Sequence, residues 1–412
     1  MKDFIKRINI FTLLIASLAF TLGWQVGHYN TTLQWKNFRP TLNVENKLPP
    51  ENISVDFKLF WDTWDLVSRK YLDKKAIDSQ KLFYGAISGM VSAIGDPYTV
   101  FLPPEQQKST REELNGSFEG VGIQLGFNKD KRLVVIAPLE GTPAESAGIK
   151  PEDVIVKIEQ KDTLNISLPE AVRLIRGPKG TEVKLTIYRN GEEDTKEFKL
   201  TRDTIIVKSV TLKMDVTKSG KKVAIIKLSR FGERTEDEWN EAVSGVLSNG
   251  AGAVVLDMRN NPGGFLDGAV FISSEFLDGG DVVLQENYEG KKNSFKVNRQ
   301  GKLLKLPTVV IINKGSASAS EIVAGALQDR KRAKLIGVKS FGKGTIQEAE
   351  DLPGGTGIHI TTARWLTPNG RWVNETEGLE PDVYVEVPEE VEEETDKEKE
   401  DVQLKRAIEL LN

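Results

Sequence analysis

Two short apolar runs restrict the folds open to this chain more than any other feature. Residues 253–256 are alanine, two valines and leucine, and residues 308–312 are threonine, two valines and two isoleucines. A strand with one face in water would carry a polar side chain at every second position, so these runs predict strands covered on both faces. A further strand over 223–228 and the helical patterns in between extend the alternation to about residue 338. We therefore predict an α/β layered core over residues 203–388.

The helix predicted after the strand over residues 223–228 has a clear start. Thr235 and Glu238 have the spacing of a capping box. The apolar positions that follow at helical spacing are Trp239, Ala242, Val243, Val246 and Leu247. We expect this face to pack on the sheet.

The N-terminus resembles a membrane segment. Lys2, Lys6 and Arg7 precede an uncharged run from residue 8 to about residue 26, and the next charge is Lys36. This length can span a bilayer, and the basic flank places the N-terminus in the cytoplasm and the body outside it. A signal peptide cleaved near residues 17–19 is the alternative. We predict an anchor over residues 1–28 and a proline-containing linker over residues 29–54.

Residues 55–115 have a helical pattern, and we interpret their large side chains as core. The first helix carries Phe57, Phe60, Trp61, Trp64, Leu66 and Val67, and the second carries Leu82, Ala86, Met90 and Ile94. Proline at 97 ends the second helix, because it disfavours helical backbone in the preceding residue.

Residues 116–202 change to short strands with one helix, which predicts a small β domain. Val183, Leu185 and Ile187 alternate as a half-buried strand does. The helix starts at Ser167, with Glu170 in capping-box spacing.

The entry to this β domain predicts a peptide site. Its residues are Gly120, Val121, Gly122 and Ile123. Their N–H groups are suited to hold a C-terminal carboxylate, while the peptide adds as a strand beside residues 123–125. An ordinary glycine turn is the alternative. Arg173 and Arg176 lie where they can sense the carboxylate, although arginines there are equally often solvated.

Composition excludes several classes of function. Fifty-six basic and 60 acidic residues give a net charge of −4, which disfavours a nucleic-acid partner. The chain has no cysteine and only two histidines, so disulfides, thiol catalysis and a His-rich zinc site are disfavoured. We predict no metal or organic cofactor.

Residues 315–321 read Gly-Ser-Ala-Ser-Ala-Ser-Glu and place serines at a predicted strand-to-helix turn. Small neighbours keep space clear around Ser318, and a helix N-terminus offers N–H groups to a developing oxyanion. Capping of the helix is the alternative, and it accounts well for Ser316 or Ser320. The only histidines are His28 and His359, so a lysine is the better candidate for a base.

Lys343 lies between two glycines and is that candidate. A base must be neutral, so Lys343 requires burial that lowers its pKa; a solvated surface charge is the alternative. Gln347 follows four residues later, roughly 13 Å away if the chain is extended. A hydrogen bond between the two side chains therefore requires a bend or bulge, which Gly342 and Gly344 permit.

Residues 257–264 follow the 253–256 strand and predict a turn. Gly264 allows close backbone approach, and we pair its N–H with that of Ala319 as an oxyanion hole. Asp257 and Arg259 are expected to hold this loop.

Together these motifs resemble the C-terminal processing peptidases, or tail-specific proteases, over about residues 57–387. The stretches that carry the resemblance are residues 95–99, 120–122, 176–181, 259–264, and the serine and lysine motifs. The resemblance implies a crotonase-like protease core, an inserted PDZ domain and a C-terminal helix within residues 389–412. It also implies Ser318 as nucleophile, Lys343 as general base, Gln347 as its orienting partner, and Gly264 and Ala319 as oxyanion donors.

The expected function is a serine endopeptidase whose PDZ domain recognises the C-terminal tail of protein substrates. Some members of the family form homodimers through terminal helices and others are monomers. Two rivals stay open: a PDZ adaptor without catalysis, and an acyl-CoA enzyme on a similar core.

Overall fold

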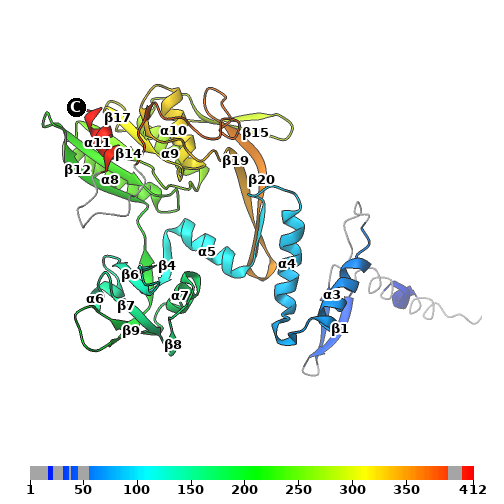
Figure 1. Ribbon diagram of the computed structural model, residues 1–412. Helices are drawn as coiled ribbons and strands as arrows, with labels where there is room; N and C mark the ends of the chain where they lie inside the picture. The colour runs from blue at the N-terminus through cyan, green and yellow to red at the C-terminus, as the bar shows by residue number, and fades with distance from the viewer. Residues whose placement is uncertain (1–16, 22–30, 37–38, 45–54, 388–400) are drawn as a thin grey trace, which may run out of the picture. The chain divides into compact units, whose positions relative to one another are not determined.

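The computed structural model describes residues 17–21, 31–36, 39–44, 55–387 and 401–412 (Figure 1). The chain divides into two compact units, before and after residue 79. Most of the predicted anchor over residues 1–28 lies outside the described residues. Its described part, residues 17–21, is helical. None of the helices within the described ranges combines the length and the apolar character that crossing a membrane requires.

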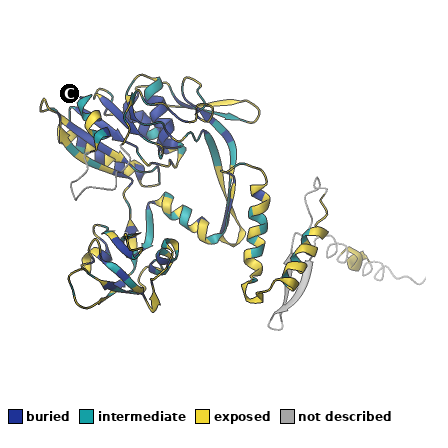
Figure 2. Cartoon of the chain, in the orientation of Figure 1, coloured by how far each residue is buried: buried dark blue, intermediate teal, exposed yellow. Residues whose placement is uncertain are grey.

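The first unit differs from its prediction in two ways. Within the predicted linker, β1 (Thr31–Lys36) and β2 (Arg39–Val44) pair as antiparallel strands. Helix α3 (Lys58–Lys70) buries no residue, and Trp61 is 60% exposed (Figure 2). Its aromatic rings pack mainly on one another, as Phe60 and Trp61 do at 4.9 Å between centroids. The prediction of core packing was therefore wrong, because helical periodicity shows that a face is apolar and not that another layer covers it.

The second unit begins with helices that lead into the β domain. In α4 (Ser79–Ser92) only Val91 is buried, and Met90 and Ile94 are exposed, again against the prediction of core packing. Strand β3 (Val100–Leu102) and helix α5 (Pro104–Asn115) follow.

The β domain has its own sheet and core. Its sheet has the order β10-β9-β7-β6-β5, with β8 beside β7. The bounds of these elements are β5 (Ile123–Phe127), β6 (Leu133–Pro138), α6 (Pro143–Ser146), β7 (Val154–Ile158), β8 (Lys161–Asp162), α7 (Leu168–Ile175), β9 (Glu182–Tyr188) and β10 (Lys196–Thr201). Val183, Leu185 and Ile187 are buried, as their alternation predicts. A two-stranded sheet of β4 (Ser117–Gly120) and β11 (Asp203–Ile206) joins the ends of the domain.

The largest sheet has the order β12-β13-β14-β17-β18-β21. Its strands are β12 (Val210–Val216), β13 (Lys222–Leu228), β14 (Ala253–Asp257), β17 (Thr308–Ile312), β18 (Lys334–Gly337) and β21 (Val383–Tyr384). Five of these strands, β13, β14, β17, β18 and β21, are mutually parallel, and β12 is antiparallel to β13. Every residue of β14 and β17 is buried, which confirms strands covered on both faces.

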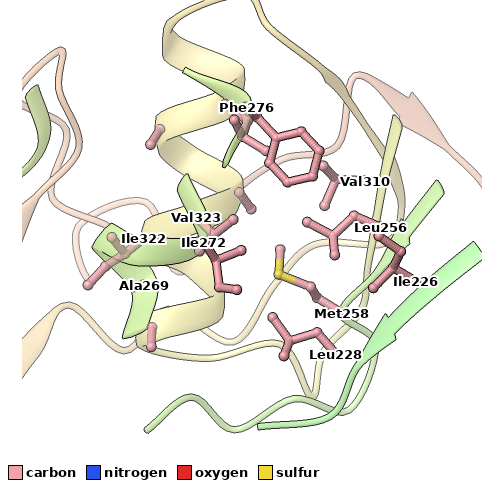
Figure 3. Close-up of a cluster of buried hydrophobic side chains, with 14 of the residues drawn as sticks. Ile226, Leu228, Leu256, Met258, Ala269, Ile272, Phe276, Val310, Ile322 and Val323 are labelled. Atoms are coloured by element: carbon pink, nitrogen blue, oxygen red, sulfur yellow. The ribbon is translucent and has the colours of Figure 1, made fainter. Parts of the chain in front are cut away.

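Alternate residues of these strands enter two cores. Val254, Leu256 and Val310 face the core formed with α8 (Thr235–Ser248), α9 (Leu266–Phe276) and α10 (Ala319–Asp329) (Figure 3). Val255 and Ile311 face the opposite core, which α11 (Val402–Glu409) closes through Ala407, together with Leu411 just after the helix. The α/β layering is thus confirmed, with the C-terminal helix docked on the sheet.

A second sheet lies next to this core and has the order β16-β15-β20-β19, with β3 beside β20. Its strands are β15 (Asp281–Asn287), β16 (Lys292–Lys296), β19 (Thr345–Leu352) and β20 (Thr356–Leu366), and the short helix η2 (Pro353–Gly355) joins the last two. The β19–β20 register shifts between Ile346 and Gln347. The residue left without a partner is Thr362 of β20, so this bulge lies on β20 and is not the bend or bulge expected between Lys343 and Gln347.

Both predicted capping boxes are absent as such. The Ser167 side chain makes no cap bond, and Glu170 pairs with Lys161. Glu238 accepts hydrogen bonds from the N–H groups of Ser209 and Val210 at 2.6 and 3.1 Å. Tertiary partners thus take both carboxylates from the helix starts. Leu247, expected on the packed face of α8, is 49% exposed.

Candidate active site

Ser318 lies at the turn between β17 and α10, where the backbone is strained. Its φ of 55° and ψ of −116° are rare for a residue with a side chain, and such a conformation costs on the order of 1–3 kcal/mol. Ser318 is also the N-cap residue of α10, and its N–H donates to the Glu321 side chain as in a capping box, so the capping alternative holds as well. A cap normally has extended backbone, and the strain therefore points to a further role for this serine.

The serines on either side of Ser318 have structural partners. The Ser316 hydroxyl donates to Met258 O at 2.8 Å, and the Ser320 hydroxyl donates to Asn261 O at 3.0 Å. The Ala317 N–H also donates to Asn261 O, at 2.9 Å. These contacts join the loop after β17 to the loop after β14, the neighbouring parallel strand. The two loops therefore form one rigid surface at the carboxyl ends of the strands.

Lys343 is half-buried, and its backbone is fixed on both sides. Its carbonyl oxygen accepts from Trp365 Nε1, and that of Gly344 accepts from Trp372 Nε1, both at 2.9 Å. A Cβ on Gly344 would lie 2.6 Å from Trp372 Nε1, so only glycine allows this close approach. The flanking glycines therefore permit tight packing of the loop that carries the lysine.

The Lys343 ammonium lies 4.7 Å from the centre of the Tyr98 ring. Burial lowers the pKa of Lys343 below its usual value, while the charges of Asp96 and Glu321 act in the opposite direction. The net decrease is the direction that a lysine base requires.

Glu321 joins the serine and lysine motifs and was missed as a functional residue by the sequence analysis. Its fully buried carboxylate accepts from the backbone N–H groups of Ser318 at 2.8 Å and Lys343 at 2.9 Å. It also accepts from the Gly342 N–H at 2.7 Å and the Ser340 hydroxyl at 2.6 Å. Burial raises the pKa of Glu321, although these four hydrogen bonds lower it in part. One carboxylate thus fixes the backbone of both candidate catalytic residues.

The predicted oxyanion donors lie beside Ser318. Neither the Ala319 nor the Gly264 N–H donates to an acceptor among the described residues. A Cβ on Gly263 would lie 2.9 Å from Ala319 N and 2.9 Å from Ser318 Cβ. The space left by the absence of this Cβ therefore adjoins the Ala319 N–H and the Ser318 side chain. The arrangement is therefore suited to receive an oxygen atom beside the serine.

Gln347 makes different hydrogen bonds from the predicted one. Its Nε2 donates to the hydroxyl oxygens of Thr345 at 2.9 Å and Thr361 at 3.0 Å. The hydrogen bonds found among the described residues do not include one between Gln347 and Lys343. The sequence analysis did not predict these threonine partners.

A cavity of about 480 Å³ unites the candidate site. Its lining includes all five predicted residues, which are Ser318, Lys343, Gln347, Gly264 and Ala319. Leu266, Ile322 and Trp365 contribute apolar surface, and His359 also borders it. Burial, together with the charge of Lys343, lowers the pKa of His359. The cavity can therefore hold an apolar side chain beside a serine, a lysine and two free N–H groups.

The peptide site predicted in the β domain is open at one strand edge. Strand β5 has β6 as its only partner in this sheet, so its other edge is exposed to an added strand. Gly122 has a φ of 78°, and a Cβ there would lie 2.4 Å from Thr142 Cβ. The turn formed by Gly120, Val121, Gly122 and Ile123 therefore requires glycine at position 122.

Arg176 reaches from the β domain to α5. Its guanidinium lies 4.4 Å above the Phe118 ring and donates to Glu112 at 3.0 Å. A Cβ on Gly120 would lie 3.7 Å from Arg176 Cγ, so this arginine borders the predicted carboxylate site. The charge of Arg173 lowers the pKa of Glu170.

Asp257 and Arg259 hold their loop, as expected. Arg259 donates to Asp257 at 2.6 Å and to Asp401 at 2.7 Å, which ties the loop to the start of α11. Over the ranges that the structure describes, no cluster of three or more histidine, aspartate or glutamate side chains could hold a metal ion.

Comparison with known proteins agrees with this architecture. Peptidase family S41 matches residues 222–385, the PDZ domain matches residues 109–188, and the N-terminal domain of the activating protease CtpB matches residues 25–106. The carboxyl-terminal-processing protease of Synechocystis sp. is 38% identical, and the match covers 80% of this chain and 81% of that protein. The chain belongs to the C-terminal processing proteases of the S41 family.

A second relative is matched over a smaller share of its length. The carboxy-terminal processing protease CtpA of Bacillus subtilis is 40% identical over 76% of this chain and 65% of that protein. Among solved structures, an S41 protein of Bacteroides fragilis covers 82% of this chain and 92% of its own, at 16% identity and a TM-score of 0.52. This structural likeness supports the fold.

Proposed function

We propose that this chain is a serine endopeptidase that cleaves protein substrates with a Ser318–Lys343 dyad. The observation that carries the proposal is Glu321, whose buried carboxylate accepts from the N–H groups of both residues at the rim of one cavity. A helix cap alone would not require a buried carboxylate shared with a lysine loop. The lowered pKa of Lys343 fits a base that must lose its proton.

The reaction follows from these positions. Neutral Lys343 takes the proton of the Ser318 hydroxyl as Oγ attacks the scissile carbonyl carbon. The carbonyl oxygen becomes an oxyanion that accepts from the N–H groups of Gly264 and Ala319. When the carbonyl re-forms, the C–N bond breaks and protonated Lys343 gives its proton to the leaving amine. Water then attacks the acyl ester, Lys343 takes the water proton, and Ser318 is released with a proton on Oγ.

Gln347 is proposed to orient the lysine during these steps. Its Oε1 receives no hydrogen bond from a described residue, and it is the only part of the amide that can accept from an ammonium group. Both side chains line the same cavity, so we propose that this oxygen accepts from the Lys343 ammonium during the reaction.

Substrate selection is proposed to depend on the PDZ domain. A flexible C-terminal tail would add beside β5, with its carboxylate at the turn of residues 120–123. Arg176 borders that turn and donates a hydrogen bond to Glu112 of α5. A bound tail would therefore be connected through Arg176 to helix α5. We also propose, from Lys2, Lys6, Arg7 and the uncharged run after them, that the body is anchored to a membrane on its extracytoplasmic side.

The test is cleavage of an unstructured protein that ends in apolar residues, with fragments identified by mass spectrometry. The full chain should cleave it, and neither Ser318→Ala nor Lys343→Ala should. A chain without residues 116–202 should lose its preference for the tailed substrate over a tail-less one. Cleavage by Ser318→Ala, or binding without cleavage by the parent, would overturn the proposal, and the second result would favour an adaptor.

A further inference from the structure

The turn at residues 96–99 lies next to the proposed base, and nothing in the dyad mechanism uses it. Strand β3 follows this turn and pairs with β20, where His359 is opposite Val100. The turn is thereby held against the strand that also partners β19 of the lysine loop. The Tyr98 ring lies under the Lys343 ammonium at 4.7 Å.

A chain of hydrogen bonds leads from this turn to Gln347. The Thr99 hydroxyl donates to Asp96 Oδ2 at 2.7 Å and accepts from the Thr361 N–H at 3.0 Å. The Thr361 hydroxyl accepts from Gln347 Nε2 at 3.0 Å. Burial raises the pKa of Asp96, but hydrogen bonds from Thr361, Thr99 and the backbone outweigh it and leave the pKa low, so the carboxylate is ionised.

These contacts hold the Gln347 amide in place. An ionised carboxylate can only accept, so the Thr99 hydroxyl gives its proton to Asp96 and offers a lone pair to the Thr361 N–H, which fixes Thr361 beside Gln347. The Thr345 hydroxyl accepts from the same Nε2 at 2.9 Å. With Nε2 bound to both threonine hydroxyls, Oε1 is the end of the amide that is left for Lys343.

We propose that Asp96, acting through Thr99 and Thr361, is a positioning residue that fixes the Gln347 amide with its carbonyl oxygen available to Lys343. The inference rests on the proposed Ser-Lys function and assigns a role to the turn at residues 96–99. The substitution Thr361→Val keeps the shape of the side chain but removes the acceptor. It should lower kcat roughly 10-fold, a part of what a well-placed acid–base group supplies, and leave KM nearly unchanged.

A double-mutant cycle separates positioning from a structural effect. If Thr361 acts through Gln347, Thr361→Val should have no further effect on kcat in a Gln347→Ala background. Thr361→Ser retains the hydroxyl and should restore most of the activity. The matched control is Thr362→Val, because the Thr362 hydroxyl donates to Glu348 at 3.1 Å and is not among the hydrogen-bond partners of Gln347. This control should have parental kcat.

The pH profile gives an independent readout for Asp96. The groups that act on Lys343 are Asp96 and Glu321, which raise its pKa, together with His359 and the Tyr98 ring beside it. Asp96→Asn removes one of the two charges that raise this pKa, so the acid limb of kcat/KM should move to lower pH while the maximum falls. Thr361→Val should lower the maximum with little movement of the limb.

The assays use the full chain with the unstructured substrate, and the outcomes are distinct. If Ser318→Ala or Lys343→Ala still cleaves, the proposed function fails, and the inference fails with it. If both are inactive but Thr361→Val has parental kcat, the inference alone fails. It also fails if Thr361→Val lowers kcat equally with and without Gln347.

Discussion

Replacing Glu321 by glutamine tests whether one buried carboxylate holds both catalytic residues in place. The Oε1 atom accepts from Ser340 and Gly342, and Oε2 accepts from Ser318 and Lys343. Glutamine has the same shape but only one acceptor oxygen, so two of the four hydrogen bonds are lost. A hydrogen bond to a charged group contributes about 1.5–3 kcal/mol, so the two losses amount to roughly 3–6 kcal/mol.

Part of this loss is offset. Burial raises the pKa of Glu321, so the charge is costly in the folded state, and a neutral amide removes that cost. The pKa of Glu321 is higher in the folded state than in the unfolded state, so its protonation adds to the free energy of unfolding. This contribution is fully present below the unfolded pKa and is lost as the pH rises through the folded pKa. Relative to Glu321→Gln, the parent should thus become more stable toward acidic pH.

We expect the folded Glu321→Gln protein to lose roughly 100-fold in kcat/KM, since a small displacement of reacting groups has effects of this size. Glu275→Gln is the matched control. Glu275 is also fully buried, and it accepts from Arg299 at 2.7 Å, the Leu303 N–H at 3.1 Å and Trp239 Nε1 at 3.2 Å, but it does not line the cavity.

The assay is steady-state cleavage at several pH values, with the free energy of unfolding from urea titration. Glu275→Gln should lower the free energy of unfolding and leave kcat/KM within about twofold, because it loses hydrogen bonds outside the site. If Glu321→Gln also retained kcat/KM within a few-fold of the parent, the carboxylate would be a structural cap and the reasoning would be refuted.

Two further predictions concern the oxyanion hole and the base. Gly263→Ala should reduce kcat by about 100-fold or more, since its Cβ would lie 2.9 Å from Ala319 N and 2.8 Å from Ala317 O at a φ of 101°. Circular dichroism should show a folded protein, and parental kcat in that protein would contradict the geometry. Activity should rise with pH as Lys343 loses its proton, with a midpoint below the usual 10.5 because burial lowers the pKa. A profile that is flat from pH 6 to roughly 10 would exclude a lysine base.

Periodicity predicted the layers of the core, because it reflects burial directly. The apolar runs at residues 253–256 and 308–312 are strands with every residue buried. The same argument failed for α3, since an apolar helix face does not reveal whether a neighbouring element covers it. Capping-box spacing failed at Glu170 and Glu238 for a related reason: their partners, Lys161 and Ser209, come from other elements.

The sequence predicted those residues of the candidate site that belong to short motifs. Ser318, Lys343 and Gln347 line one cavity, whereas the bulge near Gln347 lies on β20 and not on β19. Glu321 lies within the serine motif, but its role depends on donors at residues 340, 342 and 343, which only the fold brings together. The threonine partners of Gln347 were missed for the same reason, because Thr361 is opposite it on β20.

The dyad is tested most directly by covalent labelling of the full chain with a fluorophosphonate, which reacts with an activated serine hydroxyl, followed by peptide mass spectrometry. We predict a single adduct on Ser318, formed at a rate that rises with pH as Lys343 becomes neutral. Lys343→Ala should be labelled much more slowly, and Ser318→Ala should not be labelled. An adduct on Ser316 or Ser320, or equal labelling of Lys343→Ala and the parent, would contradict the Ser-Lys assignment.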